Sequence, residues 1–210
     1  MNIRTILALA CLVTWPALAL DTPLNPPGYH SEPQRIVPVD PLTGDPRSIV
    51  YTYSTSVVGL VPAAAATDIF CISGSATKTV RVLRMSIGAT ATAAAIGDIL
   101  LVKRSTANTA GTSTAPAVVA NDSTNPAGTA VVLAYTANPT TGTLVGNMRS
   151  RKLALGTLTG SVVDSVDFNW TVGGEQALVL RGIAQVACLN YNGQTMAGNL
   201  VNLGLMWSEE

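Results

Sequence analysis

The sequence predicts an all-β protein, an antiparallel β-sandwich or jelly roll preceded by an extended proline-rich N-terminal arm. From Ala63 to Glu210, short β-type apolar runs alternate with Ser, Thr, Ala, Gly and Asn spacers, and no stretch has helical period and length. From residue 21 to Pro62, eight prolines exclude a helix interior or a central strand. The expected organisation is therefore a leader (1–20), an arm (21–62) and a β-sandwich domain (63–210).

The first residues have the anatomy of a secretory signal. Arg4 gives a short positive start, an uncharged stretch runs from Thr5 to Leu20, and Ala17-Leu18-Ala19 is a small-x-small cleavage motif. We expect cleavage between Ala19 and Leu20. The stretch is shorter than a membrane span of about 20 residues and contains Pro16, so it predicts no permanent membrane span. If it is retained, it is better suited to a subunit interface than to water.

The proline-rich residues 21–62 have two interpretations that the sequence leaves open. A stiff arm loses less entropy when it docks along a neighbouring subunit, and the same composition also suits a linker between leader and domain. Ile49 to Val58 could be a strand contributed by this arm, because Tyr51 and Tyr53 alternate with polar neighbours.

The domain is expected to hold about nine strands. In Thr77–Ile87 the apolar phase shifts by one residue between Val82 and Leu83, which indicates a β-bulge. Gly97–Arg104 is apolar on both faces and should be central, whereas Val166 to Val172 alternates like a half-buried strand. The other expected strands are Thr67–Ser73, Thr129–Thr136, Leu144–Met148, Ala177–Leu180, Ile183–Asn190 and Asn199–Trp207.

Two connections stand out between these strands. Asn192-Gly193 predicts a tight turn before the last strand. Ser105–Gly128 is too polar for the core and too long for a hairpin turn, so we expect an exposed loop. It is interpreted either as a contact surface for a partner or as a tolerated insertion.

Cys71 and Cys188 each lie inside a β-type run, where a small apolar thiol is ordinary core filling. Export would favour a disulfide between them, which requires Cα atoms within about 7 Å. The sequence slightly favours free buried thiols, and the disulfide is the alternative. A metal site is not expected, because these two cysteines and the distant His30 do not make a tetrahedral ligand set.

Charge is scarce and unevenly distributed. Charged residues make up 11% of the chain, against a typical value of about 25%, and the net charge is zero, which suits permanent assembly. Residues 74–152 carry eight Lys and Arg against Asp98 and Asp122, whereas residues 153–210 carry Arg181 against five carboxylates. These opposite charges are expected to pair within the sheet or between subunits. Because the cations are not interleaved with aromatic residues, no nucleic-acid partner is predicted.

No catalytic constellation is present, so the sequence predicts neither an enzyme nor a cofactor. Nucleophilic catalysis needs an imidazole beside the nucleophile, and the only histidine, His30, lies in the arm. Asp164 and Asp167 are the only close carboxylate pair of the domain, and alternation would place them on opposite faces of a strand. We expect them to solvate a turn and a strand edge.

Several runs resemble a family of β-rich structural proteins of tailed bacteriophages, over roughly residues 65 to 210. They are Asp68–Val82 (DIFCISGSATKTVRV), Leu101–Asn108 (LVKRSTAN), Ala134–Thr140 (AYTANPT), Leu178–Gly182 (LVLRG) and Trp207–Glu210 (WSEE). The resemblance implies a place in a virion, as a capsid decoration, spike or neck/tail accessory protein.

The expected function is therefore structural. The protein would self-associate, for instance as a trimer, and dock on other virion proteins such as capsid or tail subunits. The leader departs from the usual pattern of cytoplasmically assembled virion proteins. The alternative is an exported bacterial β-sandwich binding module, periplasmic or secreted, with its signal peptide cleaved.

Overall fold

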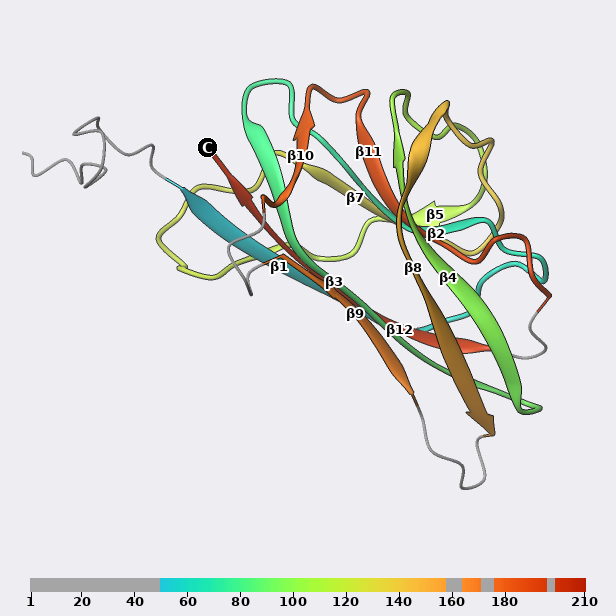
Figure 1. Cartoon of the computed structure of the whole chain (residues 1–210). Coiled ribbons are helices and arrows are strands. Elements are labelled where there is room, and N and C mark those ends of the chain that lie inside the picture. The colour runs from blue at the N-terminus through green and yellow to red at the C-terminus, as the bar shows by residue number, and fades with distance from the viewer. Residues whose placement is uncertain (1–49, 158–163, 171–175, 196–198) are drawn as a thin grey trace, which may run out of the picture. The chain divides into compact units, whose positions relative to one another are not determined.

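A computed structural model of the chain (Figure 1) describes residues 50–157, 164–170, 176–195 and 199–210. They belong to one compact unit, Ser48–Glu210. The described residues form strands and no helix, which confirms the all-β class. The strands are β1 (Tyr51–Leu60), β2 (Asp68–Ser73), β3 (Thr79–Ala91), β4 (Ala95–Arg104), β5 (Ser113–Thr114), β6 (Val119–Ala120), β7 (Val131–Tyr135), β8 (Leu144–Thr157), β9 (Ser165–Asn169), β10 (Leu178–Arg181), β11 (Val186–Asn190) and β12 (Leu200–Glu209).

These strands make one curled mixed sheet in the order β5-β7-β2-β11-β4-β8-β3-β12-β1-β6, and β9 and β10 also pair with β3. The pairings are antiparallel except for β3 with β8, where Thr90 faces Gly156. The sequence predicts an antiparallel arrangement, and the structure departs from it at this one pairing among the described strands. The exception arises where the sheet curls and the end of β8 meets the end of β3.

The strand starting at Tyr51 lies within the range 21–62 that the sequence assigns to the arm. It pairs along its length with β12, from Tyr51 opposite Glu209 to Leu60 opposite Val201. This part of the range is therefore a sheet strand. The leader, its expected cleavage point between Ala19 and Leu20, His30 and the prolines before residue 50 lie outside the described residues.

The predicted bulge in β3 is confirmed. Met206 of β12 pairs with Arg84 and the next residue, Trp207, pairs with Val82, so Leu83 is the extra residue. The bulge restores the phase of the strand, because Val82 and Met85 both face the core. Leu83 uses its freed carbonyl to accept a hydrogen bond from the backbone N–H of Trp170 at 3.0 Å.

One main hydrophobic core lies on the inner side of the curl and draws residues from most of the strands. Trp207 is fully buried and stacks on Tyr53, with ring centroids 5.7 Å apart. A second, smaller cluster lies on the opposite face of β2, β4 and β11 and contains Cys71, Val102, Tyr135, Val186 and Cys188.

The predicted loop Ser105–Gly128 is largely exposed, and two short strands in it tie the sheet together. β5 pairs with β7 and β6 pairs with β1. Because β5 and β6 stand at the two ends of the strand order, the chain between them connects one end of the curled sheet to the other.

The Asn192-Gly193 turn is confirmed. Both residues have positive φ, 57° and 67°, and Gln194 N–H donates to the Tyr191 carbonyl at 3.1 Å. This pair of left-handed residues is the conformation that the Asn-Gly sequence favours.

Candidate functional site

Cys71 and Cys188 form a disulfide in the structure. β2 and β11 place the two residues directly opposite each other, with a Cα–Cα distance of 4.1 Å and an S–S distance of 2.11 Å. The structure therefore contains the disulfide, which was the alternative, and not the slightly favoured free thiols, because strand pairing places the two residues opposite each other. Because Phe70 and Ile72 point into the main core, alternation directs Cys71 to the other face of the sheet.

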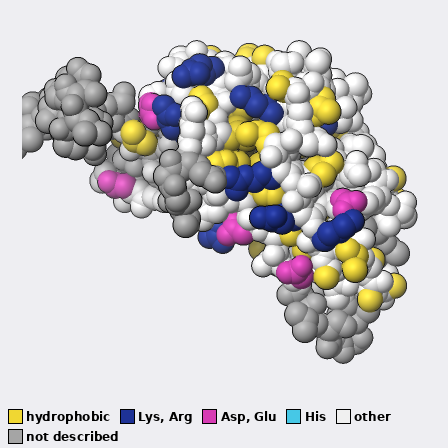
Figure 2. Space-filling model, viewed as in Figure 1, with side chains coloured by type: hydrophobic (Ala, Val, Ile, Leu, Met, Phe, Trp, Pro, Cys, Tyr) yellow, Lys and Arg dark blue, Asp and Glu magenta, His cyan; other side chains and the backbone are white. Residues whose placement is uncertain are grey.

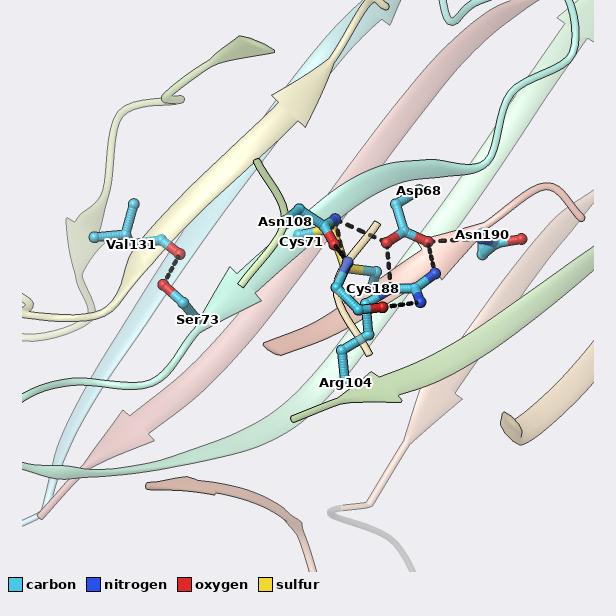
Figure 3. The surroundings of a disulfide bond; sticks show 9 residues. Asp68, Cys71, Ser73, Arg104, Asn108, Val131, Cys188 and Asn190 are labelled. Atoms are coloured by element: carbon cyan, nitrogen blue, oxygen red, sulfur yellow. Dashed lines mark hydrogen bonds and ion pairs between the residues drawn. A yellow bond between two sulfur atoms is a disulfide. The ribbon is translucent and has the colours of Figure 1, made fainter. Parts of the chain in front are cut away.

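A buried polar cluster lies beside this disulfide (Figure 3). Asp68 is 1% exposed and pairs with Arg104, which donates from Nε at 2.6 Å and from Nη2 at 2.8 Å. Asn190 donates to Asp68 Oδ1 at 2.6 Å and Asn108 donates to Oδ2 at 2.8 Å. Four donors thus satisfy one buried carboxylate, which makes the charge tolerable in the interior.

Asn108 covers the disulfide from the loop side. Its Nδ2 lies 3.4 Å from Cys71 Sγ and 3.8 Å from Cys188 Sγ, and its Oδ1 accepts from Gly142 N–H at 2.9 Å. Arg104 donates to the Gly142 carbonyl at 2.9 Å. A Cβ on Gly142 would lie 1.9 Å from the Thr106 carbonyl oxygen, so only glycine fits this close approach.

Asp68, Cys71 and Cys188 also place potential metal-ligating atoms within 4.8 Å of one another. In the structure the two sulfurs are bonded to each other, and the carboxylate accepts hydrogen bonds from Arg104 and both asparagines. A cation would have to displace a buried guanidinium. The arrangement therefore suits a structural role better than a metal centre.

A second buried carboxylate, Glu209, fastens the end of the loop. It is fully buried and accepts from the backbone N–H groups of Thr129 and Ala130, the Thr129 hydroxyl and the Trp207 indole N–H, at 2.7 to 3.1 Å. Lys78 Nζ lies 3.8 Å away. Burial alone would raise the pKa of Glu209, but hydrogen bonds from Ala130, Thr129 and Trp207 outweigh it and hold the pKa below its ordinary value.

The predicted pairing of opposite charges within the sheet is confirmed. Arg81 pairs with Glu210, and Arg84 Nη2 lies 2.7 Å from Asp167 Oδ2, so the basic middle of the chain meets its acidic end. Asp164 instead accepts from the backbone N–H groups of Ser165 and Ala154. The structure gives these two carboxylates separate partners, Asp164 just before β9 and Asp167 in its middle.

The outward face of β1, β12 and β3 carries a shallow trough. Three adjoining hollows of about 310, 350 and 240 Å³ share residues across these strands. Small residues alternate in its lining with apolar ones such as Val58, Leu200 and Met206, and the charged groups among its described lining residues are Arg84 and Asp167, which pair with each other. The serine and glycine residues of the lining are Ser54, Ser56, Gly59, Ser86, Gly88, Ser165 and Gly204.

The sequence pointed to Cys71 and Cys188 but missed their polar surroundings. Asp68 and Arg104 are 36 residues apart, and Asn190 lies 122 residues from Asp68. No local spacing relates them. The one available signal was an aspartate beside the apolar run of Ile69 to Ile72, since a carboxylate flanking a buried strand needs partners.

In the described part of the chain, no helix is long and apolar enough to cross a membrane. Comparison with protein-family models, with curated proteins and with solved structures finds no match to this chain, so its function has to be inferred from its own residues.

Proposed function

We propose that the chain is a non-enzymatic structural protein of a phage virion, a capsid decoration, spike or neck/tail accessory protein that acts by self-association and docking. The observation that carries self-association is the trough on β1, β12 and β3. A solvent-facing sheet surface normally carries long charged side chains, whereas Ser56, Ser86 and Gly204 allow a second surface to approach closely. The assignment to a virion depends on the resemblance of residues 65 to 210.

The proposed module is a β-sandwich or jelly roll built from the curled sheet. Two groups of strands, β5-β7-β2-β11-β4-β8 and β3-β12-β1-β6, share one main core, and they are joined by the short β3–β8 pairing. This supports a module with an inner face used for stability, which leaves the outer face for other copies.

Self-association through the trough is tested by adding charge to it. Ser56 is exposed on β1, so Ser56→Lys places a cation in the trough without disturbing the core. Ser150→Lys on β8 adds the same charge at an exposed position outside the trough. We expect native mass spectrometry to show oligomers for the wild type and Ser150→Lys but monomers for Ser56→Lys. Monomers throughout, or equal oligomers in all three proteins, would refute the proposal.

A second candidate function is favoured by the disulfide between Cys71 and Cys188, since such bonds persist in oxidising compartments. This candidate is an exported bacterial binding module whose leader is cleaved. Intact mass on protein from its natural source separates the two. A chain beginning at Leu20, monomeric and disulfide-bonded, would support export, whereas a chain beginning at Met1 in a large assembly would support the virion protein.

A further inference from the structure

The seam between β4 and β8 on one side and β9 and β10 on the other is bridged by cations. Lys103 of β4 donates from Nζ to the Val179 carbonyl of β10 at 3.0 Å. Arg149 of β8 donates to the Asn169 carbonyl of β9 at 3.2 Å, and its guanidinium lies 4.9 Å from the Trp170 ring centroid. Figure 2, drawn in the view of Figure 1, shows Lys and Arg side chains gathered over this part of the molecule.

A hollow of about 370 Å³ opens at the upper part of this seam. Among the described residues that line it, the charged ones are Lys103 and Arg181, and no carboxylate is among them. Most other cations of the described chain are neutralised, since Lys78, Arg81, Arg84, Arg104 and Lys152 each pair with an acid. Lys103 and Arg181 have no such partner among the described carboxylates. The described lining of the hollow therefore carries two positive charges and no negative one.

The hollow also offers free hydrogen-bond donors. Lys103 Nζ uses one of its three protons on the Val179 carbonyl and keeps two. The guanidinium of the exposed Arg181 makes no hydrogen bond or ion pair with the described residues, and its shape matches a carboxylate in a bidentate geometry. The Gln185 side-chain oxygen, Oε1, accepts a hydrogen bond from the backbone N–H of Arg181 at 2.9 Å. The NH₂ group of Gln185 therefore remains as a further donor.

We infer that this hollow binds the carboxylate side chains of an acidic polypeptide segment on a docking partner. Charge complementarity calls for an anion, and Met148, Ala177 and Leu178 add an apolar lining that suits the methylene groups of glutamate side chains. A nucleic-acid strand would need a longer run of cations and exposed aromatic rings for its bases. The inference deepens the proposed docking function, on which it rests, by naming the chemistry of one contact.

The test is a fluorescence-anisotropy titration of the folded, full-length protein with labelled hexaglutamate. We expect saturable binding that weakens as salt rises from about 0.01 M to about 0.15 M, because the Debye length falls from about 30 Å to about 8 Å. Lys103→Met and Arg181→Gln should each weaken binding by about tenfold. Lys152→Gln also removes one positive charge, but Lys152 pairs with Asp98 outside the hollow, so it should change binding by less than about twofold.

Three results would overturn the inference. Hexaglutamate could fail to saturate the protein at low salt, Lys152→Gln could weaken binding as much as Arg181→Gln, or a thymidine hexanucleotide could bind more tightly than hexaglutamate. Arg181 is exposed, so Arg181→Gln keeps the test valid if Lys103→Met does not fold. Native mass distinguishes the two proposals: if the wild type assembles but does not bind hexaglutamate, the inference fails and self-association stands.

Discussion

At the scale of single residues, Glu209 combines complete burial with a full set of donors. Glu209→Gln keeps the shape but removes the charge that the Thr129, Ala130 and Trp207 donors stabilise. We expect a loss of about 3 kcal/mol in the free energy of unfolding, measured by urea denaturation at pH 7. Glu210→Gln is the control, because Glu210 is partly exposed and its pair with Arg81 should contribute less than about 1 kcal/mol.

The same carboxylate makes stability depend on pH. The pKa of Glu209 is lower in the folded protein than its ordinary value of 4.5, so the unfolded chain takes up a proton first as the pH falls. Its stabilising contribution is complete above that value and is lost as the pH falls through the folded pKa. We expect the stability difference between wild type and Glu209→Gln to shrink between about pH 5 and pH 3. A constant difference over that range would contradict this assignment.

Local patterns predicted the strands better than the polar clusters. Alternation around Phe168 and Trp170 correctly marked a strand with buried apolar residues, and the phase shift at Leu83 marked a real bulge. Both signals are local in sequence. By contrast, Asp68 and Arg104 meet only because the sheet brings β2 and β4 onto either side of β11. Residue spacing carries no information about such an encounter.

At the scale of elements, β8 is a strand whose length the apolar pattern of the sequence does not predict. The apolar pattern predicts a strand from Leu144 to Met148, but β8 continues to Thr157 through Arg149, Arg151 and Lys152. β4 supplies the backbone partners, from Leu101 opposite Arg149 to Ala95 opposite Leu155. Charged side chains are ordinary on a strand that borders a seam, where they also discourage edge-to-edge association. The charged residues interrupt the apolar pattern, which resumes only at the buried Leu153 and Leu155.

The part of the loop around β6 is held on β1 by a few hydrogen bonds. Tyr53 donates from its hydroxyl to the Pro126 carbonyl at 2.9 Å, and Asn121 N–H donates to the Thr52 carbonyl at 2.9 Å. We expect Tyr53→Phe to accelerate hydrogen exchange of the Asn121 amide about fivefold, equivalent to about 1 kcal/mol.

The control for this loop prediction is Tyr51→Phe, on the same strand. The Tyr51 hydroxyl makes no hydrogen bond to the described residues, and its ring keeps its contact with Lys78. Equal acceleration of the Asn121 amide in both variants would show that the Pro126 contact does not hold the loop.

At the scale of the whole molecule, the disulfide joins residues 117 positions apart. Closing so long a loop restricts the unfolded chain, and we expect the Cys71→Ala/Cys188→Ala double variant to lose about 4 kcal/mol of stability by guanidinium denaturation. The wild type measured with reductant should approach the same midpoint. If the oxidised and reduced wild type unfold at the same midpoint, the bond contributes nothing to stability.

The pairing of β1 with β12 also has a mechanical consequence. Tyr51 lies opposite Glu209, so the chain enters and leaves the described domain through neighbouring, antiparallel strand ends. A force that pulled these two ends apart would act across the strands and peel β1 from β12 one hydrogen bond at a time. A force along the strands would instead load all these bonds together. A tether built from both ends would thus be weak, whereas attachment through one end and a sheet face would resist tension.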